Sequence, residues 1–83
     1  MNTLQNAISS RMENRDIFAR NLFWLRNERK LSQEELGFRS GLHRSTIQNL
    51  ENRKRSPTLK NLAKLAGALE VTIEELISPR RED

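Results

Sequence analysis

Hydrophobic residues recur along most of the chain with the period of an α-helix, and they predict helices throughout. The first clear series begins just after Asp16, a favourable N-cap residue. Its hydrophobic positions, Phe18, Leu22 and Leu25, fall on one face. They predict a helix over residues 16–30.

Two shorter helices are predicted next, on either side of a glycine. Ser32 and, three residues later, Glu35 form the pattern of a capping box, which predicts a helix over residues 33–40. Gly41 permits the positive φ of a tight turn, and a second helix is expected over residues 44–52. The residues expected to pack together across the turn are Leu36, Leu42, Ile47 and Leu50. This arrangement is a helix-turn-helix.

The remaining hydrophobic positions predict two more helices. The first follows the sequence SPTL, with apolar positions at Leu59, Leu62, Ala63, Ala66 and Leu69. Thr72 would cap a last short helix, with apolar positions at Ile73, Leu76 and Ile77. The expected fold is therefore an all-α, compact bundle of five helices. The chain is divided into an N-terminal extension over residues 1–15, a domain over 16–78 and a charged tail over 79–83.

Composition restricts the function classes. A chain of 83 residues makes one small domain with little room for a substrate cavity. The absence of cysteine excludes disulfides and thiolate metal sites, and it fits the reducing cytoplasm. His43 is the only histidine and has no partner ligands, and no catalytic motif occurs, so we expect no metal, no cofactor and no enzyme. No apolar run is long enough for a membrane span or a secretory leader.

Charge points to a polyanionic partner. The formal net charge is +4, and the basic excess lies between residues 26 and 55, whereas the region after Glu70 is acidic. A concentration of Lys and Arg in the middle of a small domain is typical of nucleic-acid binding, although solvated basic surfaces are also common.

The helix predicted over residues 44–52 has an unusual polar face. A solvated face commonly carries Glu and Lys in alternation. Here the outer positions are Arg44, Ser45, Gln48 and Asn49. Guanidinium, amide and hydroxyl groups match the donors and acceptors on base edges in the major groove of DNA. This face is therefore predicted to contact bases.

Residues 16–78 resemble the lambda-repressor-like family, which includes phage repressor and Cro proteins and small bacterial transcriptional regulators. The resemblance is carried by the ordered series LSQEELG, GLHRSTIQNLENRK, SPTLKNLAKLAGALEV and ELI. It implies that Arg44, Ser45 and Asn49 contact bases, with Gln48 a lesser candidate. It also implies that phosphate is bound by Gln33, Asn52, Lys54 and Ser56. Where many members have Gly, this chain has Arg53, which either accepts strain or changes the loop.

Two further assignments concern packing and partners. Arg26 and Glu51 flank the buried faces of their helices, and the family has such a pair, so we expect a structural ion pair between them. Phe23 and Trp24 do not fit the core. Either residues 1–15 fold back over Trp24 as an extra helix, or this surface binds a second protein.

The resemblance also implies a homodimer on a near-palindromic duplex DNA operator, acting as a transcriptional regulator and more often as a repressor. The expected dimer interface is Val71, Ile73, Leu76 and Ile77. The alternative is an antitoxin or accessory module that uses this fold to bind a protein partner. In either case the expected location is the bacterial cytoplasm, for a bacterial or phage-encoded protein, without membrane contact.

Overall fold

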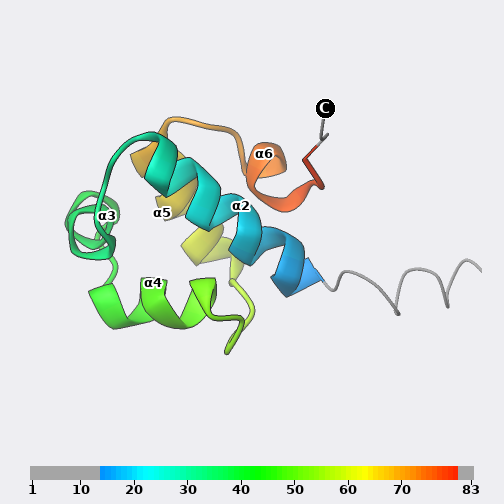
Figure 1. Ribbon diagram of the computed structural model, residues 1–83, viewed down its shortest axis with the longest axis horizontal. Helices are drawn as coiled ribbons and strands as arrows, with labels where there is room; N and C mark the ends of the chain where they lie inside the picture. The colour runs from blue at the N-terminus through cyan, green and yellow to red at the C-terminus, as the bar shows by residue number, and fades with distance from the viewer. Residues whose placement is uncertain (1–13, 81–83) are drawn as a thin grey trace, which may run out of the picture.

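The computed structural model describes residues 14–80 and contains five helices in that range (Figure 1). Their bounds are α2 Asn14–Glu28, α3 Gln33–Ser40, α4 Arg44–Glu51, α5 Leu59–Leu69 and α6 Ile73–Ile77. No residue between 14 and 80 is in a strand. The predicted all-helical fold with a helix-turn-helix is confirmed. Residues 1–13 of the predicted extension and 81–83 of the tail lie outside the described residues.

One hydrophobic core joins all five helices. Helix α2 packs against α4 and α6, α3 packs against α4 and α5, and α5 packs against α6. The buried apolar cluster consists of Phe18, Leu22, Leu25, Leu31, Leu36, Ile47, Leu50, Leu65, Ala66, Leu69 and Leu76. In Figure 1, α4 lies along one edge of the molecule, with no helix beyond it. The core therefore supports α4 from one side only.

The hydrophobic face of α5 differs from the prediction. Its buried row runs through Asn61, Leu65 and Leu69, which are spaced four residues apart. That row places Leu59 and Ala63 on the solvent side, and Leu59 is 73% exposed. The apolar face expected from Leu59 and Ala63 is therefore wrong at these two positions, because α5 packs through the row that the polar residue Asn61 begins.

Capping boxes begin three of the helices. The Ser32 hydroxyl accepts from the backbone N–H of Glu35 (2.9 Å), and the Glu35 carboxylate accepts from the backbone N–H of Ser32 (2.7 Å). The hydrogen bond from the Ser32 backbone N–H to the carboxylate, and after it a hydrogen bond of the carboxylate with the Ser32 side chain, hold the pKa of Glu35 below its ordinary value. Equivalent boxes begin α5 and α6. Asp16, in contrast, lies in the first turn of α2 and is not its N-cap, because α2 begins at Asn14.

A buried asparagine joins the first helix to the last. Asn21 on α2 is 1% exposed, and its side-chain nitrogen donates to the carbonyl oxygens of Leu76 (3.0 Å) and Ser78 (2.7 Å). Carbonyl groups at a helix C-terminus have no partner within the helix, so Asn21 supplies the donor that the end of α6 lacks. Among the described residues the Asn21 side-chain oxygen has no hydrogen-bond partner.

None of the five described helices is long and apolar enough to cross a bilayer.

Candidate nucleic-acid interface

A close approach of backbone to backbone sets the geometry of the helix-turn-helix. Gly41 ends α3 with φ 80°, and its N–H donates to the carbonyl oxygen of Gly37 (2.8 Å). The N–H of Leu42 donates to the same oxygen (3.0 Å). A Cβ atom at Gly37 would stand 2.7 Å from the carbonyl oxygen of Leu42. The absence of a side chain at position 37 therefore permits the turn to lie against α3. The close turn in turn allows α4 to pack on α3.

His43 caps the N-terminus of α4. Its Nδ1 atom accepts from the backbone N–H of Ser45 (3.0 Å) and lies 2.8 Å from the Ser45 hydroxyl oxygen. Nδ1 can accept from the backbone only when it carries no proton, so we assign the neutral tautomer with the proton on Nε2. The histidine thus orders the first turn of the helix, where Arg44 and Ser45 lie.

The outer face of α4 carries the residues predicted to contact bases. Arg44, Ser45 and Gln48 are exposed, and Asn49 is half-buried. Ile47 and Leu50 are fully buried on the opposite side. Apart from the contact of Ser45 with His43, the side chains on this outer face have no hydrogen-bond or ion-pair partner within residues 14–80. Their donors and acceptors are available to a ligand.

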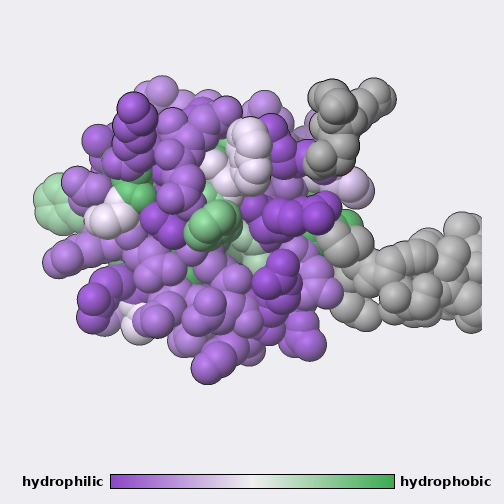
Figure 2. All heavy atoms as spheres, in the orientation of Figure 1, coloured by the Kyte–Doolittle hydropathy of each residue, from purple (hydrophilic) through white to green (hydrophobic). Residues whose placement is uncertain are grey.

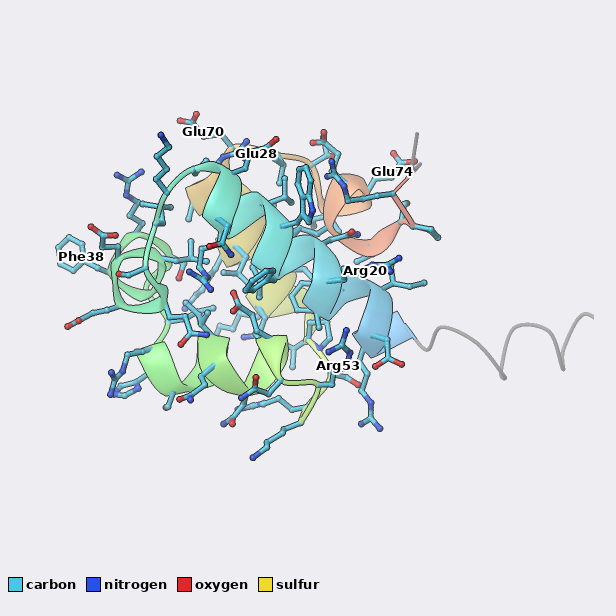
Figure 3. All side chains as sticks on the ribbon, viewed as in Figure 1. Arg20, Glu28, Phe38, Arg53, Glu70 and Glu74 are labelled. Atoms are coloured by element: carbon cyan, nitrogen blue, oxygen red, sulfur yellow. The ribbon has the colours of Figure 1, made fainter. Side chains whose placement is uncertain are left out.

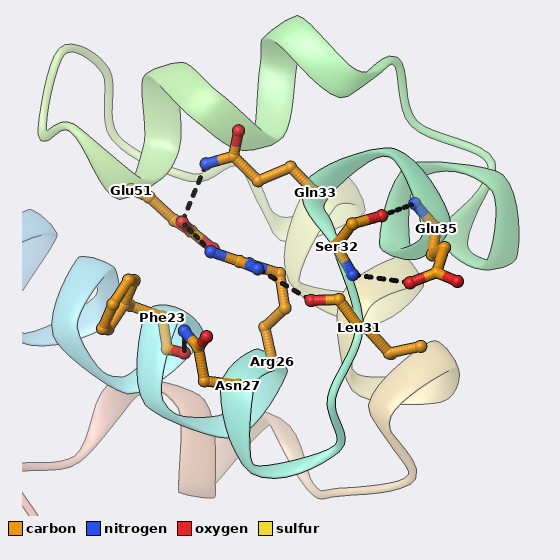
Figure 4. Close-up of polar contacts among 8 residues, drawn as sticks. All are labelled: Phe23, Arg26, Asn27, Leu31, Ser32, Gln33, Glu35 and Glu51. Atoms are coloured by element: carbon orange, nitrogen blue, oxygen red, sulfur yellow. Dashed lines mark hydrogen bonds and ion pairs between the residues drawn. The ribbon is translucent and has the colours of Figure 1, made fainter.

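A buried ion pair holds α4 against α2 (Figure 4). Arg26 donates through Nε to Glu51 Oε2 (2.7 Å) and through Nη2 to Glu51 Oε1 (3.0 Å), and both residues are 8% exposed. Nη1 of Arg26 donates to the carbonyl oxygen of Leu31 (2.7 Å). This forked contact is the ion pair that the sequence predicted. Each residue neutralises the buried charge of the other.

Gln33 joins the same group. Its side-chain nitrogen donates to Glu51 Oε1 (2.9 Å), and the residue is half-buried at the first position of α3. The resemblance implies a glutamine beside the recognition helix as well as on a phosphate, and Gln33 lies beside α4 through this contact. An amide side chain has a second N–H and a carbonyl oxygen, so the contact leaves Gln33 with further hydrogen-bonding capacity.

The structure shows which of the two alternatives, a strained residue or a changed loop, applies to Arg53 at the end of α4. Arg53 adopts the left-handed conformation with φ 61°. Its N–H donates to Leu50 O (3.2 Å), and the N–H of Lys54 donates to Asn49 O (2.9 Å), which is the pattern of a Schellman motif. The arginine therefore takes the conformation usually supplied by glycine, and the loop keeps its path. The predicted phosphate-binding residues Asn52, Lys54 and Ser56 are all exposed in and beside this loop.

The predicted dimer interface needs one correction. Leu76 is fully buried in the core of its own chain, because it is the inward position of the five-residue helix α6. Its assignment to a dimer interface was wrong. Val71 and Ile73 are half-buried and pack against the core, whereas Ile77 is 44% exposed.

Two large aromatic residues lie on the outer surface of α2. Phe23 is 51% exposed and Trp24 is 45% exposed, and with Asn27 and Glu28 they line a shallow groove of about 290 Å³. Figure 2 shows a small hydrophobic area over the middle of α2, with mostly hydrophilic residues around it. The Arg80 guanidinium lies 4.0 Å from the centre of the Trp24 ring. The segment expected to cover Trp24 falls largely outside the described residues.

Comparison with known proteins agrees with this geometry. The helix-turn-helix family HTH_3 matches residues 22–76. An uncharacterized HTH-type transcriptional regulator of Sinorhizobium fredii, y4dJ, is 39% identical over 71 residues, covering 86% of this chain and 92% of that protein. The control protein C.SmaI of Serratia marcescens is 40% identical over 67 residues, covering 81% of this chain and 80% of that protein.

A solved structure of a controller protein has the same fold. The restriction-modification controller protein C.AhdI of Aeromonas hydrophila superposes with a TM-score of 0.69 at 44% sequence identity, covering 71% of this chain and 89% of that one. The resemblance to the phage repressor and Cro proteins is confirmed by these matches. This chain belongs to the HTH_3 helix-turn-helix family of DNA-binding transcriptional regulators.

Proposed function

We propose that the protein binds duplex DNA sequence-specifically by inserting α4 into the major groove. The observation that carries this proposal is the outer face of α4, where Arg44, Gln48 and Asn49 have no partner within the described part of the chain. A face that is merely solvated has no need for side chains that match base edges. The arginine fork fits guanine O6 and N7, and the amides fit adenine N6 and N7.

The surrounding residues would position the helix on the DNA backbone. Gln33, Asn52, Lys54 and Ser56 occupy the two ends of the helix-turn-helix, where contacts to phosphate fix the register of the recognition helix. Ser45 is held by His43, and its hydroxyl oxygen can still accept a hydrogen bond from a base. Contacts of both kinds are required, because phosphate contacts position the protein and base contacts give specificity.

One domain of this size is too small for specificity in a genome. A single module buries about 600–1,000 Å² of protein surface on DNA and contacts a few base pairs. We infer a homodimer on a near-palindromic operator, with the two copies of α4 roughly 34 Å apart. Ile77, with the exposed parts of Val71 and Ile73, offers the apolar surface for it at α6. A dimer covering a promoter blocks transcription without further contacts, so repression in the cytoplasm is the simplest mode of regulation.

Selection of bound duplexes from a random pool tests the DNA-binding proposal, because it returns the preferred site, its symmetry and the half-site spacing. On that site, Arg44→Ala and Asn49→Ala should each weaken binding by about 1–3 kcal/mol and relax the preference at one base position. Lys54→Ala is the matched control, because loss of a phosphate contact should weaken all sequences alike. Equal losses on the selected and on random duplexes would remove Arg44 and Asn49 from base recognition.

A second candidate function rests on the surface of α2. The exposure of Phe23 and Trp24 favours a protein partner, as in an antitoxin or accessory module. A salt-dependent mobility shift with the purified protein separates the two functions. If the protein alone shifts no duplex even at low salt, the partner-binding function is favoured. If Phe23→Ser and Trp24→Ser leave both the shift and the oligomeric state unchanged, these residues play no part in DNA binding or assembly.

A further inference from the structure

A groove with an excess of positive charge lies between α2 and the end of α4. Its volume is about 350 Å³. The residues lining it are Ala19, Arg20, Phe23, Arg26, Gln33, Glu51, Asn52 and Arg53. Arg26 and Glu51 neutralise each other within it. The charges that remain among the lining residues are those of Arg20 and Arg53.

These two arginines differ in their surroundings. Arg20 is exposed and has no hydrogen-bond or ion-pair partner within residues 14–80. The side chain of Arg53 is 49% exposed, and its Nε lies 3.1 Å from Oδ1 of Asp16. In Figure 3, Arg20 extends from α2 and Arg53 follows the end of α4, on the same side of the molecule. The two chain segments therefore bring two guanidinium groups to one groove.

The contact with Asp16 orients Arg53 without using its whole hydrogen-bonding capacity. A guanidinium group has five N–H donors, and the carboxylate of Asp16 lies against Nε. The Nη1 and Nη2 groups remain for an anion, and an arginine fork fits phosphate oxygens. Arg53 has a left-handed backbone conformation directly after α4, and from there its side chain reaches Asp16 on α2.

We propose that Arg20 and Arg53 together bind one phosphate of the DNA backbone at this groove, next to Asn52. This site rests on the proposed DNA-binding function and adds two residues to it. Arg53 lies two residues beyond the end of α4, so a duplex that holds α4 in its major groove presents a backbone phosphate close to the groove's lining. The ligand is the sugar-phosphate backbone, and the site gives affinity without sequence preference.

Titration of a random-sequence duplex at several KCl concentrations tests the site. Each phosphate contact contributes about 0.9 to the slope of log affinity against log salt. We expect Arg20→Gln and Arg53→Gln each to reduce binding up to about tenfold at ~0.1 M salt. Because both arginines bind one phosphate, the double variant should lower the slope by about 0.9, and not by about twice that amount. Arg29→Gln removes the same charge just beyond the C-terminal end of α2 and should leave the slope almost unchanged.

Arg53→Gly separates binding from folding. Glycine adopts the left-handed conformation at position 53 without steric cost, so this variant should keep the fold by circular dichroism and still lose the same affinity as Arg53→Gln. If Arg53→Gly binds duplex as tightly as the wild type, or if Arg20→Gln and Arg53→Gln behave like Arg29→Gln, the phosphate site is overturned while DNA binding stands. Failure of the wild type to bind any duplex overturns the proposed function and the site together.

Discussion

Asn21 donates a 2.7 Å hydrogen bond to the carbonyl oxygen of Ser78, which lies 57 positions further along the chain. Together with the bond to Leu76, this contact fixes the five-residue helix α6 on α2. Short helices are marginal in water, and most of their stability comes from tertiary contacts. The position of α6, and with it the proposed dimer surface at Ile77, therefore depends on one buried amide as well as on the packing of Leu76 in the core.

Asn21→Ala should lower the free energy of unfolding by about 1–3 kcal/mol, because it leaves buried carbonyl groups without a donor. Urea unfolding measures the loss. Asn27→Ala is the control on the same helix, since Asn27 is exposed and donates only to Phe23 O within α2. That variant should change stability by less than about 0.5 kcal/mol. Equal effects of the two substitutions would show that Asn21 does not support α6.

Arg26 and Glu51 should behave as one unit. Arg26→Met or Glu51→Leu alone strands the partner's charge in a buried site and should cost about 3–5 kcal/mol. The double variant removes both charges and should lose clearly less than the sum of the single losses. A double-mutant cycle by urea unfolding measures the coupling. Strict additivity would mean that the two charges are solvated independently.

Two glycines should respond in opposite directions to alanine. At Gly37 the new Cβ would meet the backbone of Leu42 at 2.7 Å, and backbone cannot move aside cheaply, so Gly37→Ala should be destabilising and should displace α4. At Gly67, inside α5, the Cβ meets nothing within 4 Å. Gly67→Ala should therefore stabilise by up to about 1 kcal/mol through helix propensity. Thermal unfolding and DNA affinity distinguish the two, and a stable Gly37→Ala protein with full DNA affinity would contradict the close-approach argument.

The charge of Glu35 should make the stability of α3 depend on pH. Hydrogen bonds from Ser32 lower the pKa of Glu35 in the folded state, so its contribution is present above the unfolded-state pKa of about 4.3 and is lost as the pH falls through the lower folded-state value. Glu35→Gln keeps the capping geometry without the charge. The wild type should be the more stable at neutral pH, and the difference should disappear in acid. A difference that stays constant with pH would exclude the charge as its source.

Ile77→Glu tests the proposed dimer. Ile77 is 44% exposed and outside the core, so the variant should stay folded, sediment as a monomer and bind a full palindrome little better than a half-site. Leu59→Glu places the same charge at an exposed apolar position on α5 and should leave assembly unchanged. A wild type that sediments as a monomer at micromolar concentration and binds half-sites independently contradicts the dimer.

The parts of the fold with local signals were predictable from the sequence. Ser32 and Glu35 lie three residues apart, and Gly41 is the residue that a left-handed turn favours, so the helix-turn-helix could be placed from the sequence. The Arg26–Glu51 pair was also predictable, because two opposite charges beside buried helix faces need partners.

Other features of the structure are not indicated by any local pattern in the sequence. Asn21 is one polar residue among many on a helix, and only the docking of α6 shows that it is buried. The sequence left two alternatives open at Arg53, a strained left-handed residue or a changed loop, and it could not decide between them, because the left-handed conformation is rare for a residue other than glycine. The burial of Leu76 depends on which side of a five-residue helix meets the core, and the apolar pattern of Ile73, Leu76 and Ile77 does not decide this.

The hydrogen bonds that run from Leu31 through Arg26 and Glu51 to Gln33 make α2, α3 and α4 one stiff body. Such a body cannot reshape itself to suit a groove that is too narrow or wrongly twisted. The duplex has to bend or twist instead, and the energy of doing so depends on its sequence. We therefore expect the protein to distinguish DNA sites partly by how easily they deform, including at base pairs that no side chain touches.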